Sequence, residues 1–194
     1  MRHKFAFSTM IATCFGVGFA PFAPGTFGSI VAFPLYMLLT YLLSMAHGGV
    51  SNIVTSELIN SLLVVTTALF FLGLWASERY SKNTGIEDPK EVVIDEVVGQ
   101  LLAICLVMFF LPYIGGEAIM KFKSHGIEEL HLALLNLAAS FILFRIFDIR
   151  KPWPIDYIDK NYKGGLGIML DDIVAAIFAV AMQFFILYAI IDRL

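Results

Sequence analysis

Two pairs of adjacent acidic residues are the first candidates for chemistry. Asp95-Glu96 and Asp171-Asp172 each lie directly against a long apolar run. Adjacent carboxylates at the edge of apolar surroundings repel each other, and each is costly to desolvate. A divalent cation relieves both costs, and oxygen ligands without a His/Cys spacing favour Mg²⁺. We therefore predict a metal site formed by Asp95, Glu96, Asp171 and Asp172, with Mg²⁺ as the cofactor.

Helix capping is the alternative for part of this acidic set. The segment GIEDPKEVVIDEVVG, residues 85–99, also carries Glu87 and Asp88. Acidic residues near the start of a helix interact favourably with its dipole, and Asp-Pro is a typical start. Capping accounts for two or three of these acids but less well for Asp95-Glu96, so a functional role is favoured for that pair.

Basic residues that suit phosphate recognition follow in FRIFDIRKPWPI, residues 144–155. Arg145, Asp148 and Lys151 recur every three residues, so they share one face if a single helix contains them. Two prolines then end that helix. Arg145, as a bidentate fork, and Lys151, as a point charge, are the candidates for binding phosphate. Asp148 is a candidate to orient them, to bind metal or to act as a base.

Two glycine-rich segments are candidates for binding an anion through backbone N–H groups. GVGFAPFAPGTFGS, residues 16–29, is too rich in glycine and proline for a stable helix, and it adds the Thr26 and Ser29 hydroxyls. The second segment is Gly164-Gly165-Leu166-Gly167, a predicted turn in which Gly164 and Gly165 let backbone approach a phosphate at a helix start. A plain turn is the alternative for the first segment.

The composition requires a membrane around these residues. Hydrophobic residues make up 59% of the 194-residue chain and charged residues 15%, against about 25% in soluble proteins. Runs near the roughly 20 residues that a bilayer needs occur at about 29–46, 58–76, 97–114, 131–147 and 173–191. We predict one all-α membrane domain, residues 1–194, a helical bundle with about five transmembrane helices. A short N-terminal helix within residues 5–20 and a re-entrant-type Gly/Pro loop precede them.

The charges predict an orientation for these spans. Five spans with a cytoplasmic start place residues 1–28, 77–96 and 148–172 inside, together with Arg145. Only Lys121, Lys123 and Arg193 then lie outside, which is a strong positive-inside bias. The basic residues on the inner side are Arg2, Lys4, Arg79, Lys82, Lys90, Arg145, Arg150, Lys151, Lys160 and Lys163. The same alternation places all three unusual segments on the cytoplasmic side, which supports a single site.

Four segments together resemble the signature segments of the bacterial phosphatidylglycerophosphatase A family. They are GFAPFAPGTFGS, IDEVVG, FRIFDIRKPWPI and GGLGIMLDDIVAA, within residues 16–32, 93–99 and 144–176. The resemblance implies an Mg²⁺-dependent enzyme of the bacterial cytoplasmic membrane, a phosphoric monoester hydrolase. It would remove the terminal phosphate of phosphatidylglycerophosphate to give phosphatidylglycerol. Carried over by motif, the candidate catalytic acids are Asp95, Glu96, Asp148, Asp171 and Asp172.

The residues are compatible with this chemistry and leave some alternatives open. Mg²⁺ would neutralise phosphate charge and position a water, while an aspartyl-phosphate intermediate is the other route. The expected partners are the phospholipid substrate and the bilayer, with no nucleic acid, and the oligomeric state is left open. The rival functions are a CDP-alcohol-type lipid phosphotransferase, whose regularly spaced aspartates are missing here, and a cation-binding membrane transporter. A transporter would place its acids near mid-membrane rather than at one interface.

Overall fold

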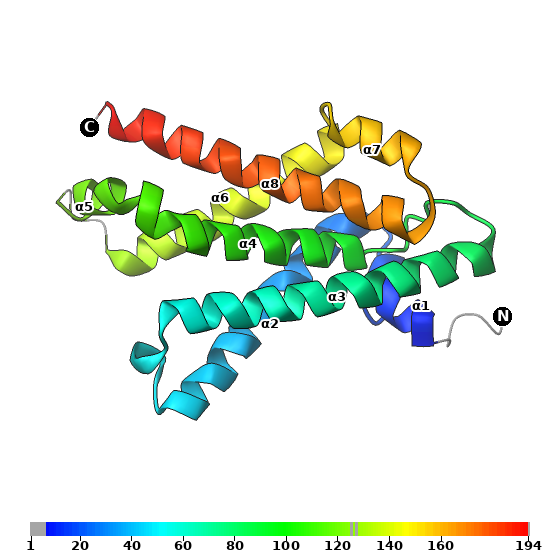
Figure 1. The fold of residues 1–194 in the computed structure, drawn as a ribbon, viewed down its shortest axis with the longest axis horizontal. Helices are drawn as coiled ribbons and strands as arrows, with labels where there is room; N and C mark the ends of the chain where they lie inside the picture. Colours follow the sequence, from blue (N-terminus) through cyan, green and yellow to red (C-terminus); the bar gives the residue numbers. More distant parts are fainter. Residues whose placement is uncertain (1–6, 125, 127, 194) are drawn as a thin grey trace.

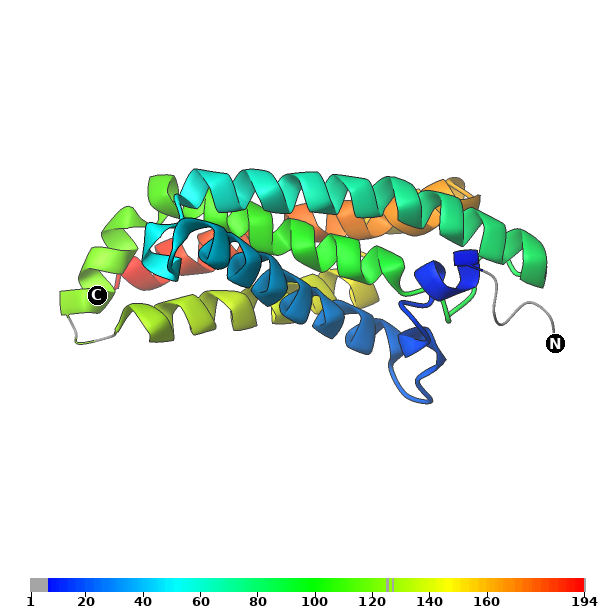
Figure 2. The ribbon, with the colours of Figure 1, turned by 90° about the horizontal axis from the view of Figure 1, so that it is seen from below.

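The computed structural model describes residues 7–124, 126 and 128–193, and these residues form a bundle of helices without strands. Five long helices make up the body of the bundle. The short helices lie at its ends (Figure 1, Figure 2). The elements are α1 (Phe7–Ala12), η2 (Val17–Phe19), α2 (Pro24–His47), η3 (Val50–Asn52), α3 (Thr55–Thr84), α4 (Ile94–Ile114), α5 (Gly116–Ser124), α6 (Glu129–Arg150), α7 (Ile155–Asn161) and α8 (Gly164–Ile191). The predicted all-α class is confirmed.

Five of the described helices are long and apolar enough to cross a membrane, which confirms the predicted number of spans. They are α2, α3, α4, α6 and α8, and each contains one of the predicted apolar runs. The expected N-terminal helix is shorter than residues 5–20, because α1 ends at Ala12 and the chain then turns. Residues 5 and 6 lie outside the described part. The chain is therefore a multi-pass membrane protein.

Two helices begin earlier than the sequence predicts. α2 begins at Pro24 and α8 at Gly164, so parts of both glycine-rich segments are helical. Proline suits a first helical position because its missing N–H has no partner to lose there. The glycines permit close packing: a Cβ on Gly28 would lie 2.9 Å from the carbonyl oxygen of Val93. The predicted loop is therefore shorter than expected, and the predicted turn before Asp171 is wrong.

α4 is the central helix of the bundle. It packs against α2, α3, α6 and α8. Fifty-six per cent of its apolar segment is buried inside the protein, compared with 11% for α2 and 11% for α6. Polar groups carried by α4 are therefore surrounded by protein rather than by lipid, and they need partners within the bundle.

The helix ends define two sides of the molecule. The connections between α1 and α2, between α3 and α4, and from α6 through α7 to α8 lie at one end (Figure 1). The connection between α2 and α3, the helix α5 and the end of α8 lie at the other. The structure therefore gathers the three unusual segments at one end of the bundle, as the alternation of spans predicts.

Gly99 sets how closely α4 approaches its neighbours, and its replacement by alanine tests this packing. A Cβ on Gly99 would lie 2.6 Å from the Phe144 ring and 3.1 Å from the Asp172 carbonyl oxygen. We expect Gly99→Ala to destabilise the protein by about 1–3 kcal/mol, because the ring and a backbone segment must shift. The same change at Gly116 meets no atom within 4 Å. Equal melting temperatures of the two variants in detergent would contradict this packing.

Candidate active site

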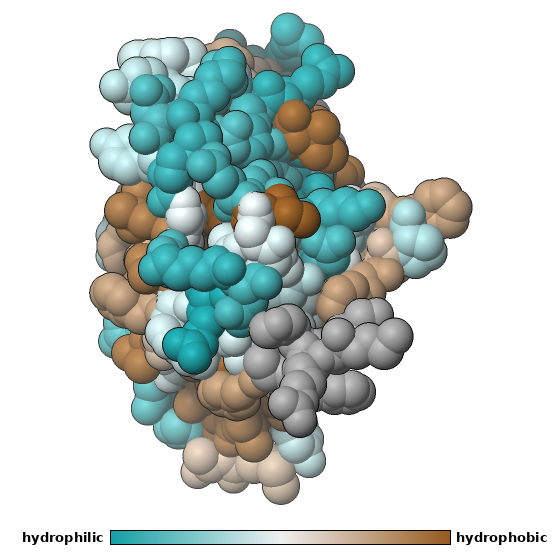
Figure 3. Space-filling model, turned by 90° about the vertical axis from the view of Figure 1, so that its right-hand side faces the viewer, coloured by the Kyte–Doolittle hydropathy of each residue, from teal (hydrophilic) through white to brown (hydrophobic). Residues whose placement is uncertain are grey.

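A cavity opens at the end of the bundle where the three unusual segments meet. Its volume is about 480 Å³, which is within the range of small-ligand sites. The start of α2, the segment before α4 and its first turn, the end of α6, Asp159 of α7 and the start of α8 line it. Hydrophilic residues cover much of this end of the molecule (Figure 3). Every predicted site residue lines the cavity except Ser29 and Gly165.

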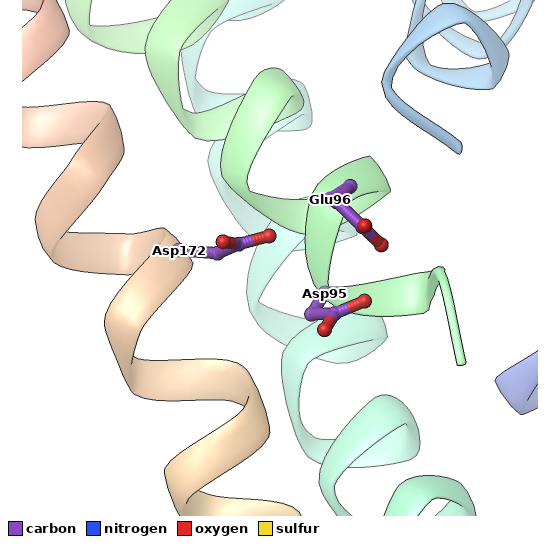
Figure 4. A group of neighbouring side chains, drawn as sticks. All are labelled: Asp95, Glu96 and Asp172. Atoms are coloured by element: carbon purple, nitrogen blue, oxygen red, sulfur yellow. The ribbon is translucent and has the colours of Figure 1, made fainter. Parts of the chain in front are cut away.

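Asp95, Glu96 and Asp172 form a group of three carboxylates in this cavity. Each offers one oxygen, and the three oxygens lie within 4.8 Å of one another. Figure 4 shows Asp172 extending from α8 toward the first turn of α4, which carries Asp95 and Glu96. One buried oxygen of each residue has no hydrogen-bond donor among the described residues. Such a set of carboxylate oxygens fits a hard divalent cation.

Asp171 is paired with a lysine instead of joining that group. Lys151 Nζ lies 2.6 Å from Asp171 Oδ2 and 2.6 Å from Asp159 Oδ1. Adjacent residues on a helix point about 100° apart, so Asp171 and Asp172 face different neighbours. The structure thus brings together three of the four predicted metal ligands and gives Asp171 a different partner.

Lys151 ends α6 rather than extending its face. Lys151 is the residue after the helix and has φ 40°. Pro152 disfavours helical backbone at Lys151, so the helix ends before it. The predicted common face required a single helix through Lys151, and that condition is not met, although Lys151 still lines the cavity. Burial alone would lower the pKa of Lys151, but the carboxylates of Asp171 and Asp159 outweigh burial and raise that pKa above its ordinary value. Lys151 therefore remains positively charged near neutral pH.

Arg145 carries the second positive charge into the site. Its Nη1 lies 2.5 Å from Asp148 Oδ2 and 4.0 Å from Glu96 Oε1. All three side chains are only 13–14% exposed, so water screens these ion pairs weakly. Arg145 Nη1 also donates to Ser29 Oγ over 3.4 Å. Asp148 and Ser29 therefore fix the guanidinium beside the carboxylate group.

Two residues predicted to bind phosphate instead support neighbouring groups. Ser29 is buried, and its hydroxyl contacts Arg145 rather than the cavity. The Gly165 N–H donates to Glu78 Oε2 over 2.7 Å, so this amide is not free for an anion. The residues of the predicted phosphate set that line the cavity are Thr26, Arg145, Lys151 and Gly164.

Two contributors to the site, Asp159 and Glu78, are not among the residues predicted from the sequence. Asp159 lies on α7, and a signal for that helix exists: Pro154 precedes IDYIDKN, which has an acid in its first turn. Glu78 lies on α3, four residues before Lys82, and this spacing is typical of a surface ion pair. Its contact with α8 depends on the packing of two helices that are distant in sequence.

Fold and site together define a class of protein: a multi-pass helical membrane protein with a carboxylate group and two basic side chains at one end of the bundle. Comparison with known proteins then identifies the family. The chain belongs to the phosphatidylglycerophosphatase A family, whose model matches residues 10–187. It is therefore a phosphoric monoester hydrolase, and the resemblance seen in its motifs is confirmed. The match favours neither the phosphotransferase nor the transporter.

Curated relatives cover nearly the whole chain. Phosphatidylglycerophosphatase A of Escherichia coli (strain K12) is 30% identical over 91% of this chain and 81% of its own length. Phosphatidylglycerophosphatase A of Haemophilus influenzae is 32% identical over 92% of this chain and 88% of its own. A Bacteroides thetaiotaomicron protein, provisionally named phosphatidylinositol-3-phosphatase, is 32% identical, with 92% of each chain covered. No solved structure matches the chain.

Glu78 anchors the start of α8, and its removal tests how the site is positioned. We expect Glu78→Ala to cost about 1 kcal/mol of stability, because the Gly165 N–H loses its acceptor. Glu78→Gln keeps an acceptor oxygen and should restore most of the loss. Lys82→Ala removes only an exposed ion pair with Glu78 and should cost well under about 0.5 kcal/mol. Thermal unfolding in detergent measures all three, and equal effects of Glu78→Ala and Lys82→Ala would refute the anchor.

Proposed function

We propose that this chain is an Mg²⁺-dependent lipid phosphatase that hydrolyses phosphatidylglycerophosphate to phosphatidylglycerol and phosphate at the cytoplasmic membrane face. The observation that carries the proposal is the group Asp95, Glu96 and Asp172 beside Arg145, in a chain of this family. Unpaired carboxylate oxygens attract a cation, and the cation together with Arg145 attracts a phosphate. The cavity lies at the ends of the candidate spans, which supports a site at a membrane interface, where a lipid headgroup lies.

In this proposal Asp95, Glu96 and Asp172 hold the Mg²⁺. Their buried oxygens without donors fit a cation that takes only oxygen ligands. When bound, Mg²⁺ supplies positive charge that neutralises phosphate oxygens and favours attack by water. Hydrolysis then forms a bond from the water oxygen to phosphorus and breaks the phosphorus bond to the glycerol oxygen, which takes up a proton.

The basic residues bind and orient the phosphate. Arg145 points donors at the cavity from a position fixed by Asp148 and Ser29, so little ordering is needed when the phosphate binds. Lys151 is held in the same way by Asp159 and Asp171. Asp148 and Asp171 therefore act as positioning residues for the two cations. Thr26 and Gly164 line the same cavity and suit the remaining phosphate oxygens.

A phosphoinositide is the alternative substrate, because the Bacteroides thetaiotaomicron relative carries a phosphatidylinositol-3-phosphatase name. Both lipids present a phosphate monoester on a polar headgroup at the interface. The carboxylates and basic residues act on the shared phosphate, so selectivity must come from residues around the rest of the headgroup. Phosphate release from the two lipids, measured side by side with purified protein, decides between them.

Substitutions of the carboxylates separate metal binding from phosphate binding. We expect Asp95→Asn and Asp172→Asn to lower phosphate release by at least about 100-fold, because loss of a direct ligand should cost no less than the roughly 10–100-fold that loss of a residue supporting a ligand costs. Both should also lose Mn²⁺ binding measured by electron paramagnetic resonance. Asp171→Asn should lower activity while Mn²⁺ still binds, because Asp171 holds Lys151.

Asp156→Asn is the matched control, since Asp156 lies outside the cavity lining and pairs with the exposed Lys160 on α7. Phosphate release by wild-type protein should stop when EDTA is added and return with Mg²⁺. Full activity of Asp95→Asn or Asp172→Asn, or wild-type release that ignores EDTA, would refute the metal assignment.

Cysteine labelling tests the proposed orientation. Both native cysteines, Cys14 and Cys105, are buried. Lys163→Cys, at the cavity end, should react with a membrane-impermeant maleimide only in inside-out vesicles. Ser56→Cys, at the opposite end, should react in right-side-out vesicles. Both positions are exposed. The reverse pattern would place the site on the outer face.

A further inference from the structure

A second hollow lies along the bundle between α2, α4 and α6. Its volume is about 340 Å³, and its walls are almost wholly apolar. Tyr36 of α2, Ile104 of α4 and the α6 residues Ala133 and Leu137 line it. Ile119 of α5 lines it at the end of the bundle that lies away from the carboxylates. We call this hollow the lateral groove.

The lateral groove continues the helix faces that carry the candidate active site. On α6, Asp148 lines the cavity, and Ser140, Leu137 and Ala133 line the groove. These positions lie 8, 11 and 15 residues before Asp148, which is the spacing of one helical face. On α4, Glu96 and Ile104 are related in the same way.

A pair of buried polar residues marks the boundary between cavity and groove. Gln100 of α4 donates to Ser140 of α6 over 3.4 Å. Gln100 is one helical turn beyond Glu96, and Ser140 is the groove residue nearest Arg145 along α6. Beyond them Asn136 also lines the groove, but its side chain is hydrogen-bonded to the Leu132 carbonyl and to Gln183. The other groove residues on α4 and α6 beyond Gln100 and Ser140 are apolar, so this part of the groove suits hydrocarbon.

The part of the groove from Ser140 to Ala133 lies within the depth of about one leaflet. With a rise of about 1.5 Å per residue, Ser140 lies about 7.5 Å and Ala133 about 18 Å along α6 from Arg145. One leaflet contributes about 15 Å of hydrocarbon, half of a core about 30 Å thick. A lipid whose phosphate contacts Arg145 therefore has its acyl chains at the depth of this groove.

The neighbouring helices leave the groove accessible from the bilayer. α2 and α6 diverge toward the end of the bundle that lies away from the cavity (Figure 1, Figure 2). Only 11% of the apolar segment of each is buried inside the protein. An α-helix with side chains is about 10–12 Å wide, which is more than a hollow of about 340 Å³ along several turns admits. A single hydrocarbon chain is the better fit.

We propose that the lateral groove binds one acyl chain of the lipid whose phosphate occupies the cavity. This inference rests on the proposed function, because it needs a lipid phosphate at Arg145. It adds a second recognition element to the site: the groove holds the chain while the cavity holds the phosphate. Chain length then affects KM, because each methylene in the groove exchanges contacts with other lipid for packing contacts with the groove wall.

A bulky side chain in the groove tests the proposal. Ala133 and Ala138 are both exposed positions on α6, but only Ala133 lines the groove. Ala133→Trp therefore places a ring in the groove, whereas Ala138→Trp places it on a surface that lines none of the described hollows. Both proteins are assayed on dioleoyl and dihexanoyl phosphatidylglycerophosphate in detergent. We expect Ala133→Trp to raise KM for the dioleoyl lipid about ten-fold or more and to leave the dihexanoyl lipid unaffected. Ala138→Trp should behave as wild type on both.

Two results would overturn the groove assignment. One is equal kinetics of Ala133→Trp and Ala138→Trp on both lipids, which is expected if bulk lipid or a second copy of the chain fills the groove. The other comes from photolabelling of wild-type protein with a lipid analogue that carries a diazirine in the middle of one chain. Labelling that is spread over all lipid-facing helices, rather than concentrated on residues 132–140, would contradict a specific acyl-chain site. If wild-type protein released no phosphate from either lipid, the proposed function would be refuted instead. The labelling pattern would still show whether an acyl chain binds in the groove.

Discussion

Burying carboxylates at the edge of a bilayer requires positive charge nearby, and the rest of this structure depends on how that charge is supplied. Asp148 and Asp171 obtain it from protein cations, Arg145 and Lys151. Within the described part of the chain, no protein cation lies as close to Asp95, Glu96 or Asp172, since Arg145 Nη1 approaches Glu96 only to 4.0 Å. An unpaired charge in such surroundings costs several kcal/mol. The site thus combines fixed cations with a group that suits an exchangeable one.

The surrounding fold serves to hold this arrangement. α4 carries two of the acids in its first turn, at one end of the helix that the other long helices surround. Contacts from distant segments then fix what faces the acids: Ser29 on α2 meets Arg145, and Glu78 on α3 meets the start of α8. Both contacts join residues that are far apart in sequence, so the site forms only when the whole bundle is packed.

The sequence predicts the spans well because hydropathy alone determines which segments can lie in a membrane. It predicts where helices begin less well. Pro24 and Gly164 open helices because tertiary packing outweighs the low helix propensity of the glycines after them. The residue types of the site are also predictable, since clustered acids beside apolar runs need a reason. Their pairing is not: whether Asp171 or Asp172 faces α4 depends on the rotation of α8, and hydropathy leaves that rotation undetermined.

The divergence of α2 and α6 gives the enzyme a lateral opening in addition to the opening of the cavity. Cleavage of a lipid phosphate makes one product that prefers water and one that prefers hydrocarbon. The cavity opens at the hydrophilic end of the bundle, while the groove opens sideways between two helices that are largely exposed to lipid. Inorganic phosphate and the dephosphorylated lipid would therefore leave in perpendicular directions, and neither has to pass the other on its way out.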